Sequence, residues 1–218
     1  DSNNTAVGYN SGNAVTTGQQ NTLVGAYAGD ALTDADLNIA IGHNALSSDT
    51  LGSGSVAVGQ GTLNSQNFTT ATTSYNVAVG TSAGNATTTG QQNILVGGLA
   101  GTSLTDADFN TVVGHQALTS DEMGSRTTAI GRFAGFNQNF TTATDSNNVY
   151  VGYYAGANVQ TATNNTLIGT ECGDALTTGS ESVAVGTQAL STEDAHGQNT
   201  AVGMQALRDL NAGATGNN

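Results

Sequence analysis

Two acidic turns contain the side chains whose types and spacing best fit metal binding. Asp34 and Asp36 form one pair, Asp106 and Asp108 form the other, and each pair is followed two residues later by an asparagine. Oxygen-bearing side chains at alternate positions supply part of a Ca²⁺ site. Neither turn has a full ligand set, and the matching stretch 178–180 has no acidic residue. The sequence predicts solvated turns, with Ca²⁺ binding as the alternative and no other cofactor.

Two segments of identical sequence, 66–72 and 138–144, contain the candidate binding residues. Each lies in a repeat that is four residues longer than its neighbours. Each contains an asparagine followed by a phenylalanine, Asn67–Phe68 and Asn139–Phe140. Loops inserted on a rigid repeat scaffold are favoured places for binding, and a phenylalanine ring there can stack on a sugar ring. The alternative is that each ring folds back and caps its own loop.

The remaining reactive side chains form no pattern that predicts catalysis. A β-helical enzyme acting on polysaccharide needs two carboxylates about 5 to 9.5 Å apart along one groove, and Asp34 and Asp36 meet that distance but lie in a single turn. His43 and His115 are four repeats apart, roughly 19 Å in a stacked coil, which is too far to share a metal. The single Cys172 excludes an intrachain disulfide and replaces an alanine of the repeat, so we expect a packed free thiol. We therefore expect no enzyme and no catalytic residue.

All of these residues lie in repeats, each of which contains a copy of one short motif, Asn21-Thr22-Leu23-Val24-Gly25. The copies follow one another in steps of 17, 17, 17 and 21, and this series of four steps recurs as a longer repeat. They end at twelve glycines: Gly8, Gly25, Gly42, Gly59, Gly80, Gly97, Gly114, Gly131, Gly152, Gly169, Gly186 and Gly203. We expect one continuous array over residues 1–218, with long repeats at 1–72, 73–144 and 145–216. Because both chain ends match the interior of a repeat and not a cap, we expect a segment of a longer fibre.

The three residues before each of these glycines form regular columns. The residue immediately before the glycine is Val or Ile in all twelve copies. The residue three positions before the glycine is Thr, Val or Ile, and the residue two positions before it is Ala, Leu, Val or Tyr. β-Branched residues favour strands, and alternate strand residues share a face. We expect the two β-branched columns, which include Val96, to face inward and the middle column, which includes Leu95, to face outward.

One unit reads as a strand, a bend, a second short apolar segment and a return turn, and it can bury its apolar columns only against stacked neighbours. The sequence thus predicts an all-β fold, a parallel β-solenoid of twelve coils, one for each copy of the motif. A β-propeller is disfavoured because a unit of this length is too short for a four-stranded blade. The outward apolar column would form a stripe that soluble monomers rarely expose, so we expect a parallel homotrimer.

Composition limits the partners. The chain has 16 acidic residues, only three arginines, no lysine and no proline, and its formal net charge is −13. This balance disfavours nucleic acid, which is held mainly by cationic contacts to phosphates, and it disfavours anionic membrane surfaces. No apolar run approaches the roughly 20 residues of a membrane-spanning helix, so we expect no membrane insertion.

Several copies of the motif resemble repeats of known surface fibres. Ser55–Gly59, Asn93–Gly97 and Glu181–Gly186 look like the Asn/Ser-Val-Ala-Ile-Gly head repeat of trimeric autotransporter adhesins (YadA-like heads), and Asn199–Leu207 is similar to repeats in bacteriophage tail-fibre proteins. The resemblance covers essentially the whole chain. It implies a trimeric left-handed parallel β-roll that is extracellular, projects from a virion as a tail fibre or from a bacterial cell surface, and attaches to a cell-surface glycan or protein receptor. The chain departs from these families in its longer coils, in the insertion in every fourth coil, and in lacking stalk heptads, a membrane anchor and a tail-fibre chaperone segment.

The expected function is therefore that of a structural fibre segment that mediates surface attachment. One alternative is a filament that grows by end-to-end stacking of this chain. Two less favoured alternatives are a β-helical polysaccharide-degrading spike and an ice-binding solenoid. The last would need an unbroken threonine ladder, whereas the best threonine column, which runs from Thr16 to position 139, is interrupted at Asn67, Glu122 and Asn139.

Overall fold

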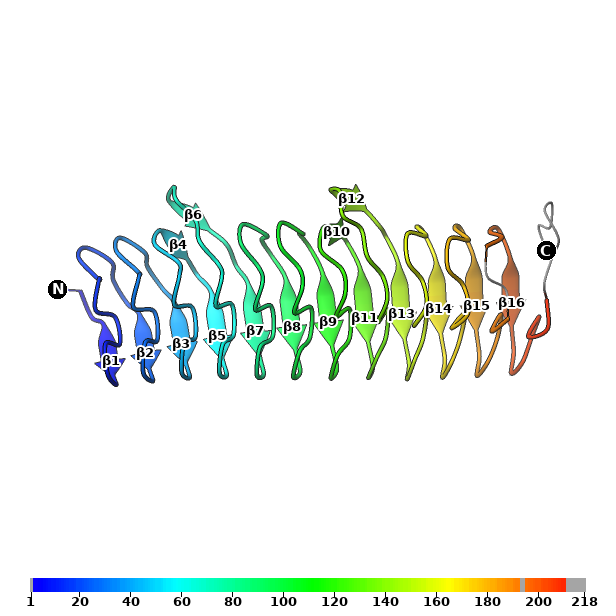
Figure 1. Cartoon of the computed structure of the whole chain (residues 1–218), viewed down its shortest axis with the longest axis horizontal. Helices are drawn as coiled ribbons and strands as arrows, with labels where there is room; N and C mark the ends of the chain where they lie inside the picture. Colours follow the sequence, from blue (N-terminus) through cyan, green and yellow to red (C-terminus); the bar gives the residue numbers. More distant parts are fainter. Residues whose placement is uncertain (1, 193–194, 211–218) are drawn as a thin grey trace. The chain divides into compact units, whose positions relative to one another are not determined.

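The computed structural model describes residues 2–192 and 195–210 of the 218-residue chain. It divides into two compact units, Asp1–Phe109 and Asn110–Asn218, which are called unit 1 and unit 2 and are described separately. Across the described residues the secondary structure consists of short strands and turns without any helix, so there is no helix that could cross a membrane. Each unit is a parallel β-solenoid of six turns, about twelve turns in all (Figure 1).

In unit 1 each turn contributes one three-residue strand to the main sheet. These strands are β1 (Thr5–Val7), β2 (Thr22–Val24), β3 (Ile39–Ile41), β5 (Val56–Val58), β7 (Val77–Val79) and β8 (Ile94–Val96). Neighbouring strands pair in parallel and in register, so that equivalent residues of successive repeats lie side by side. The first insertion adds a parallel pair, β4 (Gly52–Ser53) with β6 (Thr72–Thr73), at the end of the turns away from the main sheet (Figure 1).

Unit 2 repeats this arrangement. Its main-sheet strands are β9 (Thr111–Val113), β11 (Thr128–Ile130), β13 (Val149–Val151), β14 (Thr166–Ile168), β15 (Val183–Val185) and β16 (Thr200–Val202), again parallel and in register. The second insertion forms the parallel pair β10 (Gly124–Ser125) and β12 (Thr144–Asp145). The prediction of an all-β parallel solenoid with one strand per repeat is confirmed.

Four predictions about the array remain predictions. The boundary between the units, at Phe109 and Asn110, falls inside the second long repeat, so the single continuous array over 1–218 is not tested. The left-handed sense and the trimer are also untested. The chain ends that suggest a longer fibre include residues 1 and 211–218, which lie outside the described residues.

The prediction of which strand face points inward is wrong. The middle residue is buried in every three-residue strand except β1, whose Ala6 is exposed, and in both Leu95 of unit 1 and Leu167 of unit 2 the exposed fraction is 0%. The β-branched neighbours point outward, with 38% exposure for Ile39 and Ile41 and 44% for Ile94. In each unit the inside of the solenoid is therefore lined by the small and variable column, and the uniform Val and Ile columns lie on the outer surface.

The narrow interior of a short turn explains this orientation. Leu23 occurs in a turn with Gly29, and a Cβ atom on Gly29 would lie 2.7 Å from Leu23 Cδ2. Where the strand carries Ala40 instead, the facing position holds Leu46, which is fully buried. Each turn has space for a limited side-chain volume, so a large residue from one wall requires a small residue on the other. Identical β-branched residues in every turn would not allow this exchange.

The motif's first and last residues keep the turns in register. Asn21 Nδ2 donates a hydrogen bond to Ala35 O at 2.8 Å, while Asn38 N donates to Asn21 Oδ1 at 2.9 Å, so buried asparagines form a ladder across successive turns. The closing glycine Gly25 has a φ of +133°, and a Cβ atom there would lie 2.6 Å from the carbonyl oxygen of Gly42. Only glycine allows this bend and this close approach of backbones.

Candidate functional site

The first insertion places its phenylalanine inside the unit. Phe68 is only 4% exposed, and its backbone N–H donates to Asp49 Oδ1 at 3.0 Å. Gln66 Nε2 donates to Asp49 Oδ2 at 2.6 Å and to Ser55 Oγ at 2.9 Å. The ring therefore has no surface for stacking on a sugar, and the alternative prediction, that the phenylalanine folds back and caps its own loop, describes the structure.

The second insertion has the same arrangement in unit 2. Phe140 is 6% exposed, and its N–H donates to Asp121 Oδ1 at 2.9 Å. Gln138 Nε2 donates to Asp121 Oδ2 at 2.6 Å, and Tyr150 Oη donates to Gln138 Oε1 at 2.7 Å. Burial raises the pKa of Asp121, although the hydrogen bonds that it accepts oppose this shift, and burial together with the Asp121 carboxylate raises the pKa of Tyr150 well above its usual value. This network is closed and hydrogen-bonded, so it stabilises the insertion and offers no open reactive group.

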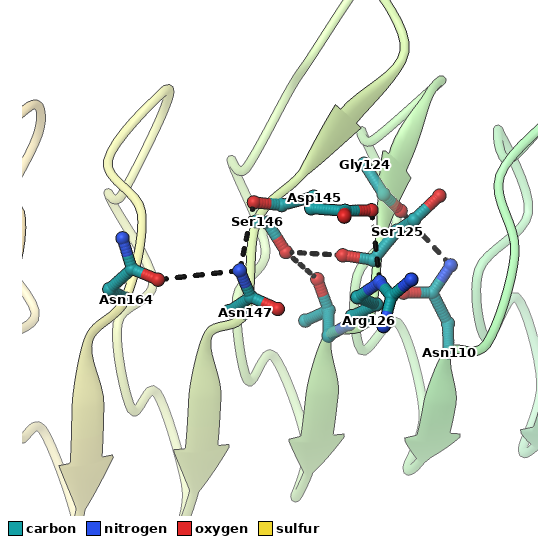
Figure 2. Close-up of polar contacts among 9 residues, drawn as sticks. Asn110, Gly124, Ser125, Arg126, Asp145, Ser146, Asn147 and Asn164 are labelled. Carbon is teal, nitrogen blue, oxygen red and sulfur yellow. Dashed lines mark hydrogen bonds and ion pairs between the residues drawn. The ribbon is translucent and has the colours of Figure 1, made fainter.

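Figure 2 shows polar contacts that join the second insertion to the neighbouring turns, several of them between buried residues. Ser146 Oγ donates to Ser125 O at 2.9 Å and is hydrogen-bonded to Thr127 Oγ1 at 2.5 Å. The Arg126 guanidinium pairs with Asp145 at 3.0 Å, but both side chains are largely exposed. An exposed ion pair contributes about 1 kcal/mol or less. These hydrogen bonds and the ion pair connect β12 and the residue after it to the preceding turn, so their role is structural.

The first acidic turn uses its carboxylates within the fold. Thr17 Oγ1 donates to Asp34 Oδ1 at 2.5 Å, and the backbone N–H of Gln19 donates to Asp36 Oδ1 at 2.6 Å. Each carboxylate therefore caps polar groups of the preceding turn. These contacts give both carboxylates a structural role within the fold.

The second acidic turn is equivalent. Thr89 Oγ1 donates to Asp106 Oδ1 and Gln91 N donates to Asp108 Oδ1, both at 2.6 Å. Burial raises the pKa of Asp108, and the neighbouring Asp106 carboxylate adds to the shift. Over the described ranges, no three His, Cys, Asp or Glu side chains gather in a way that could hold a metal ion. Ca²⁺ binding stays an untested prediction.

Cys172 is the packed thiol that its alanine position predicts. It is fully buried, and its Sγ donates to Ala184 O at 3.2 Å. Burial raises the pKa of the thiol to about 11, because the thiolate would lose its solvation. Because the thiolate is the nucleophilic and metal-binding form of cysteine, this shift makes the Cys172 thiol less reactive at neutral pH than an ordinary cysteine.

The outer surface of the main sheet in each unit is an uncharged strip, called the β-branched face. It consists of the first and third residues of the six main-sheet strands, and all of these are Thr, Val or Ile. Ile39, Ile94 and Val183 are between 38% and 44% exposed. The predicted stripe of middle-column residues is wrong, because all of those residues except Ala6 are buried, and the exposed strip is formed by the Thr, Val and Ile columns instead. Contiguous exposed apolar surface of this kind marks an interaction site.

Unit 2 also carries an aromatic cluster that sequence reasoning missed. It consists of Phe133, Phe136, Tyr153 and Tyr154, with Arg132 at its edge, in the bends that follow β11 and β13 (Figure 1). The ring centroids of Phe133 lie 5.2 Å from Phe136 and 4.8 Å from Tyr154, and those of Tyr153 and Tyr154 are 4.5 Å apart. The signal in the sequence is a departure from the long repeat.

The counterparts of these residues in unit 1, one long repeat earlier, are small or polar. They are Gln60, Gly61, Asn64, Thr81 and Ser82. At this place unit 1 has a hollow of about 220 Å³ whose lining includes Gln60, Gly61, Asn64 and Ser82. At these positions the surface is therefore aromatic in unit 2 and small or polar in unit 1.

Unit 2 also has an open polar groove, next along the chain to the aromatic cluster. It has a volume of about 520 Å³ and is lined by Ser120, Asn137, Asn139, Gln160 and Thr161. It starts at the residue that follows Phe136, and none of its lining side chains is charged. Asn139, one of the predicted binding residues, lies in it, whereas its neighbour Phe140 is buried.

Comparison with known proteins gives no relative for this chain: no family model, no curated protein and no solved structure matches it. The assignment of a function therefore depends on the residues and their geometry.

Proposed function

We propose that the chain is a segment of an extracellular structural fibre that assembles as a parallel homotrimer and attaches a virion or a bacterial cell to a surface glycan or protein receptor. The trimer has the left-handed form that the resemblance to adhesin heads and tail fibres implies. No catalytic role is part of this proposal, and neither is a resident cofactor.

The observation that carries the proposal is the β-branched face. A sheet that exposes two uninterrupted ladders of Thr, Val and Ile in each unit leaves apolar surface in water. Parallel, in-register strands present Thr, Val or Ile at the same two positions of every turn, so a second copy in the same orientation meets a similar surface along the full length of each unit. Covering this surface stabilises an assembly by about 25 cal/mol per Å² of apolar area buried.

Light scattering of the purified protein, with and without a calcium chelator, tests the assembly. The expected mass is three times that of the single chain, which is 21.7 kDa, and it does not change with the chelator. Ile94→Asp places a charge on the β-branched face and is expected to give a folded monomer. Leu37→Asp, at a residue 58% exposed in a turn outside that face, is the matched control and stays trimeric.

A monomeric wild-type protein at micromolar concentration would refute the trimer. Attachment is tested separately, by binding of the fluorescently labelled protein to a panel of bacterial cells. Failure to bind any of them would refute the attachment role.

The corrected strand orientation favours one second candidate, an ice-binding surface. Thr111, Thr128, Thr166 and Thr200 point outward in unit 2, on strands spaced by about 4.8 Å. Val149 and Val183 interrupt this ladder. A measurement of thermal hysteresis separates the candidates: a monomer that depresses the freezing point supports ice binding, and a trimer without hysteresis supports the fibre.

A further inference from the structure

The aromatic cluster of unit 2 exposes ring surface and hydroxyl groups that the fold does not use. Tyr153 is 42% exposed, and Phe133, Phe136 and Tyr154 are half-buried. Among the described residues the hydroxyl groups of Tyr153 and Tyr154 make no hydrogen bond. Rings held by their neighbours with one side in water form a surface on which the C–H face of another ring can pack.

Arg132 extends this surface with a hydrogen-bond donor. Its Cζ atom lies 4.2 Å from the centroid of the Phe133 ring. The other two arginines pair with Asp145 and Asp209, whereas the Arg132 guanidinium makes no ion pair with a described residue. Stacking on the ring orients the guanidinium, so its N–H groups remain available to a ligand.

The polar groove of unit 2 supplies donors and acceptors of a different kind. Its lining consists of side-chain amides and hydroxyls. Asn139 Oδ1 is shielded from solvent and accepts no hydrogen bond from a described residue. The carboxamide of Asn139 therefore has hydrogen-bonding capacity that the fold leaves unused, and buried polar groups of proteins are normally satisfied.

The geometry points to a binding site for a neutral oligosaccharide, formed by the aromatic cluster and the polar groove of unit 2. A sugar has an apolar C–H face for the rings and hydroxyl groups for the amides, and the site spans three turns, roughly 10 Å, enough for a di- or trisaccharide. The net charge of −13 opposes a polyanionic glycan. The site rests on the proposed attachment function and specifies the receptor class.

Unit 1 provides the variant that tests the site. Phe133→Gly, Phe136→Asn and Tyr154→Ser together replace three rings with the residues found one long repeat earlier, so each replacement is compatible with the same turn. Phe133 has a φ of 60° and its counterpart Gly61 a φ of +63°, so the glycine fits the backbone. The matched control is Tyr75→Asn, which replaces a tyrosine 63% exposed in unit 1 with its unit 2 counterpart, Asn147.

The probe is an array of neutral and acidic oligosaccharides, followed by calorimetric titration with the neutral oligosaccharide that binds best. We expect the wild type to bind neutral oligosaccharides, the triple variant to lose at least tenfold in affinity, and Tyr75→Asn to bind as the wild type does. Asn139→Ala should weaken binding by a smaller factor. Melting curves of all variants confirm that they are folded.

Three results would overturn the site: no neutral oligosaccharide is bound, only acidic ones are bound, or the folded triple variant binds as tightly as the wild type. Its failure is distinguishable from failure of the fibre proposal. A trimer that labels cells equally well with and without the three rings keeps the fibre role and loses this site. A monomer that labels no cells but binds the oligosaccharide through the rings keeps the site and loses the fibre role.

Discussion

Leu95→Ala measures how much the stability of unit 1 depends on the inward column. Leu95 is fully buried, and its Cδ atoms lie against two glycines: Cβ atoms on Gly84 and Gly101 would be 2.6 and 2.9 Å away from them. The loss of three buried carbon groups costs about 2.4 kcal/mol by transfer. The glycines have no side chains that could move into the cavity, so we expect a total near the upper end of the Leu→Ala range, about 4 kcal/mol.

The adjacent residue gives the matched control. Ile94→Thr changes a side chain that is 44% exposed, and Thr5 and Thr22 occupy the same column. We expect the free energy of unfolding of the monomer to fall by about 1 kcal/mol or less. In a trimer the cost would appear as a change in the concentration dependence of unfolding, because assembly stabilises by mass action.

Urea unfolding followed by far-ultraviolet circular dichroism, at several protein concentrations, separates the two effects. The loss for Leu95→Ala should be independent of concentration. If Ile94→Thr destabilised the monomer as much as Leu95→Ala, or if Leu95→Ala cost less than about 1 kcal/mol, the assignment of inward and outward columns would be incorrect.

Three further predictions concern the closing glycines, the insertions and the cysteine. Gly80→Ala places a Cβ atom 2.6 Å from the backbone of Gly97 at a φ of +131°, so we expect insoluble or unfolded protein on expression. The control Gly61→Ala stays folded, because the nearest atom to its new Cβ lies 3.4 Å away. Phe140→Ala should lower the free energy of unfolding in urea by about 3 to 5 kcal/mol because the ring is buried; a loss below about 1 kcal/mol would contradict its capping role. The pKa of Cys172 is raised from 9.0 to about 11 and the thiol is fully buried, so alkylation by iodoacetamide at pH 9 should be slower than for an ordinary thiol by at least a factor of roughly fifty. Since the folded pKa exceeds the unfolded one, stability should fall as pH rises from 9 to 11, less steeply in Cys172→Ala, and a fast-reacting thiol would contradict this.

The sequence by itself determined the local structure of the turns. A glycine that closes every repeat, preceded by a β-branched residue, defines where each strand ends, because Gly25 and its equivalents adopt a positive φ that other residues avoid. The asparagine that starts most copies of the motif forms a ladder across successive turns, as between Asn21 and Asn38. These features depend on contacts between equivalent residues, so periodicity predicts them.

The sequence also encodes which face of each strand points inward. The information lies in how the middle strand residue varies together with the residue four positions after the closing glycine. Leu23 occurs with Gly29 and Ala40 with Leu46, which indicates that these positions face each other across the interior. Hydrophobicity alone ranks Val and Ile as the better core residues and gives the wrong answer. The volume available in the turn decides which column is inside.

Only the tertiary structure decided where the candidate binding residues lie. Phe68 and Phe140 look like exposed loop residues, but the insertion bends back until each ring is covered, over a buried aspartate that no local pattern predicts. Phe136 and Tyr154 meet Phe133 from the same bend and from the next turn, because stacking brings equivalent residues of successive turns to one surface. Sequence spacing sets the register of such contacts, whereas the path of each turn sets which side chains reach the surface.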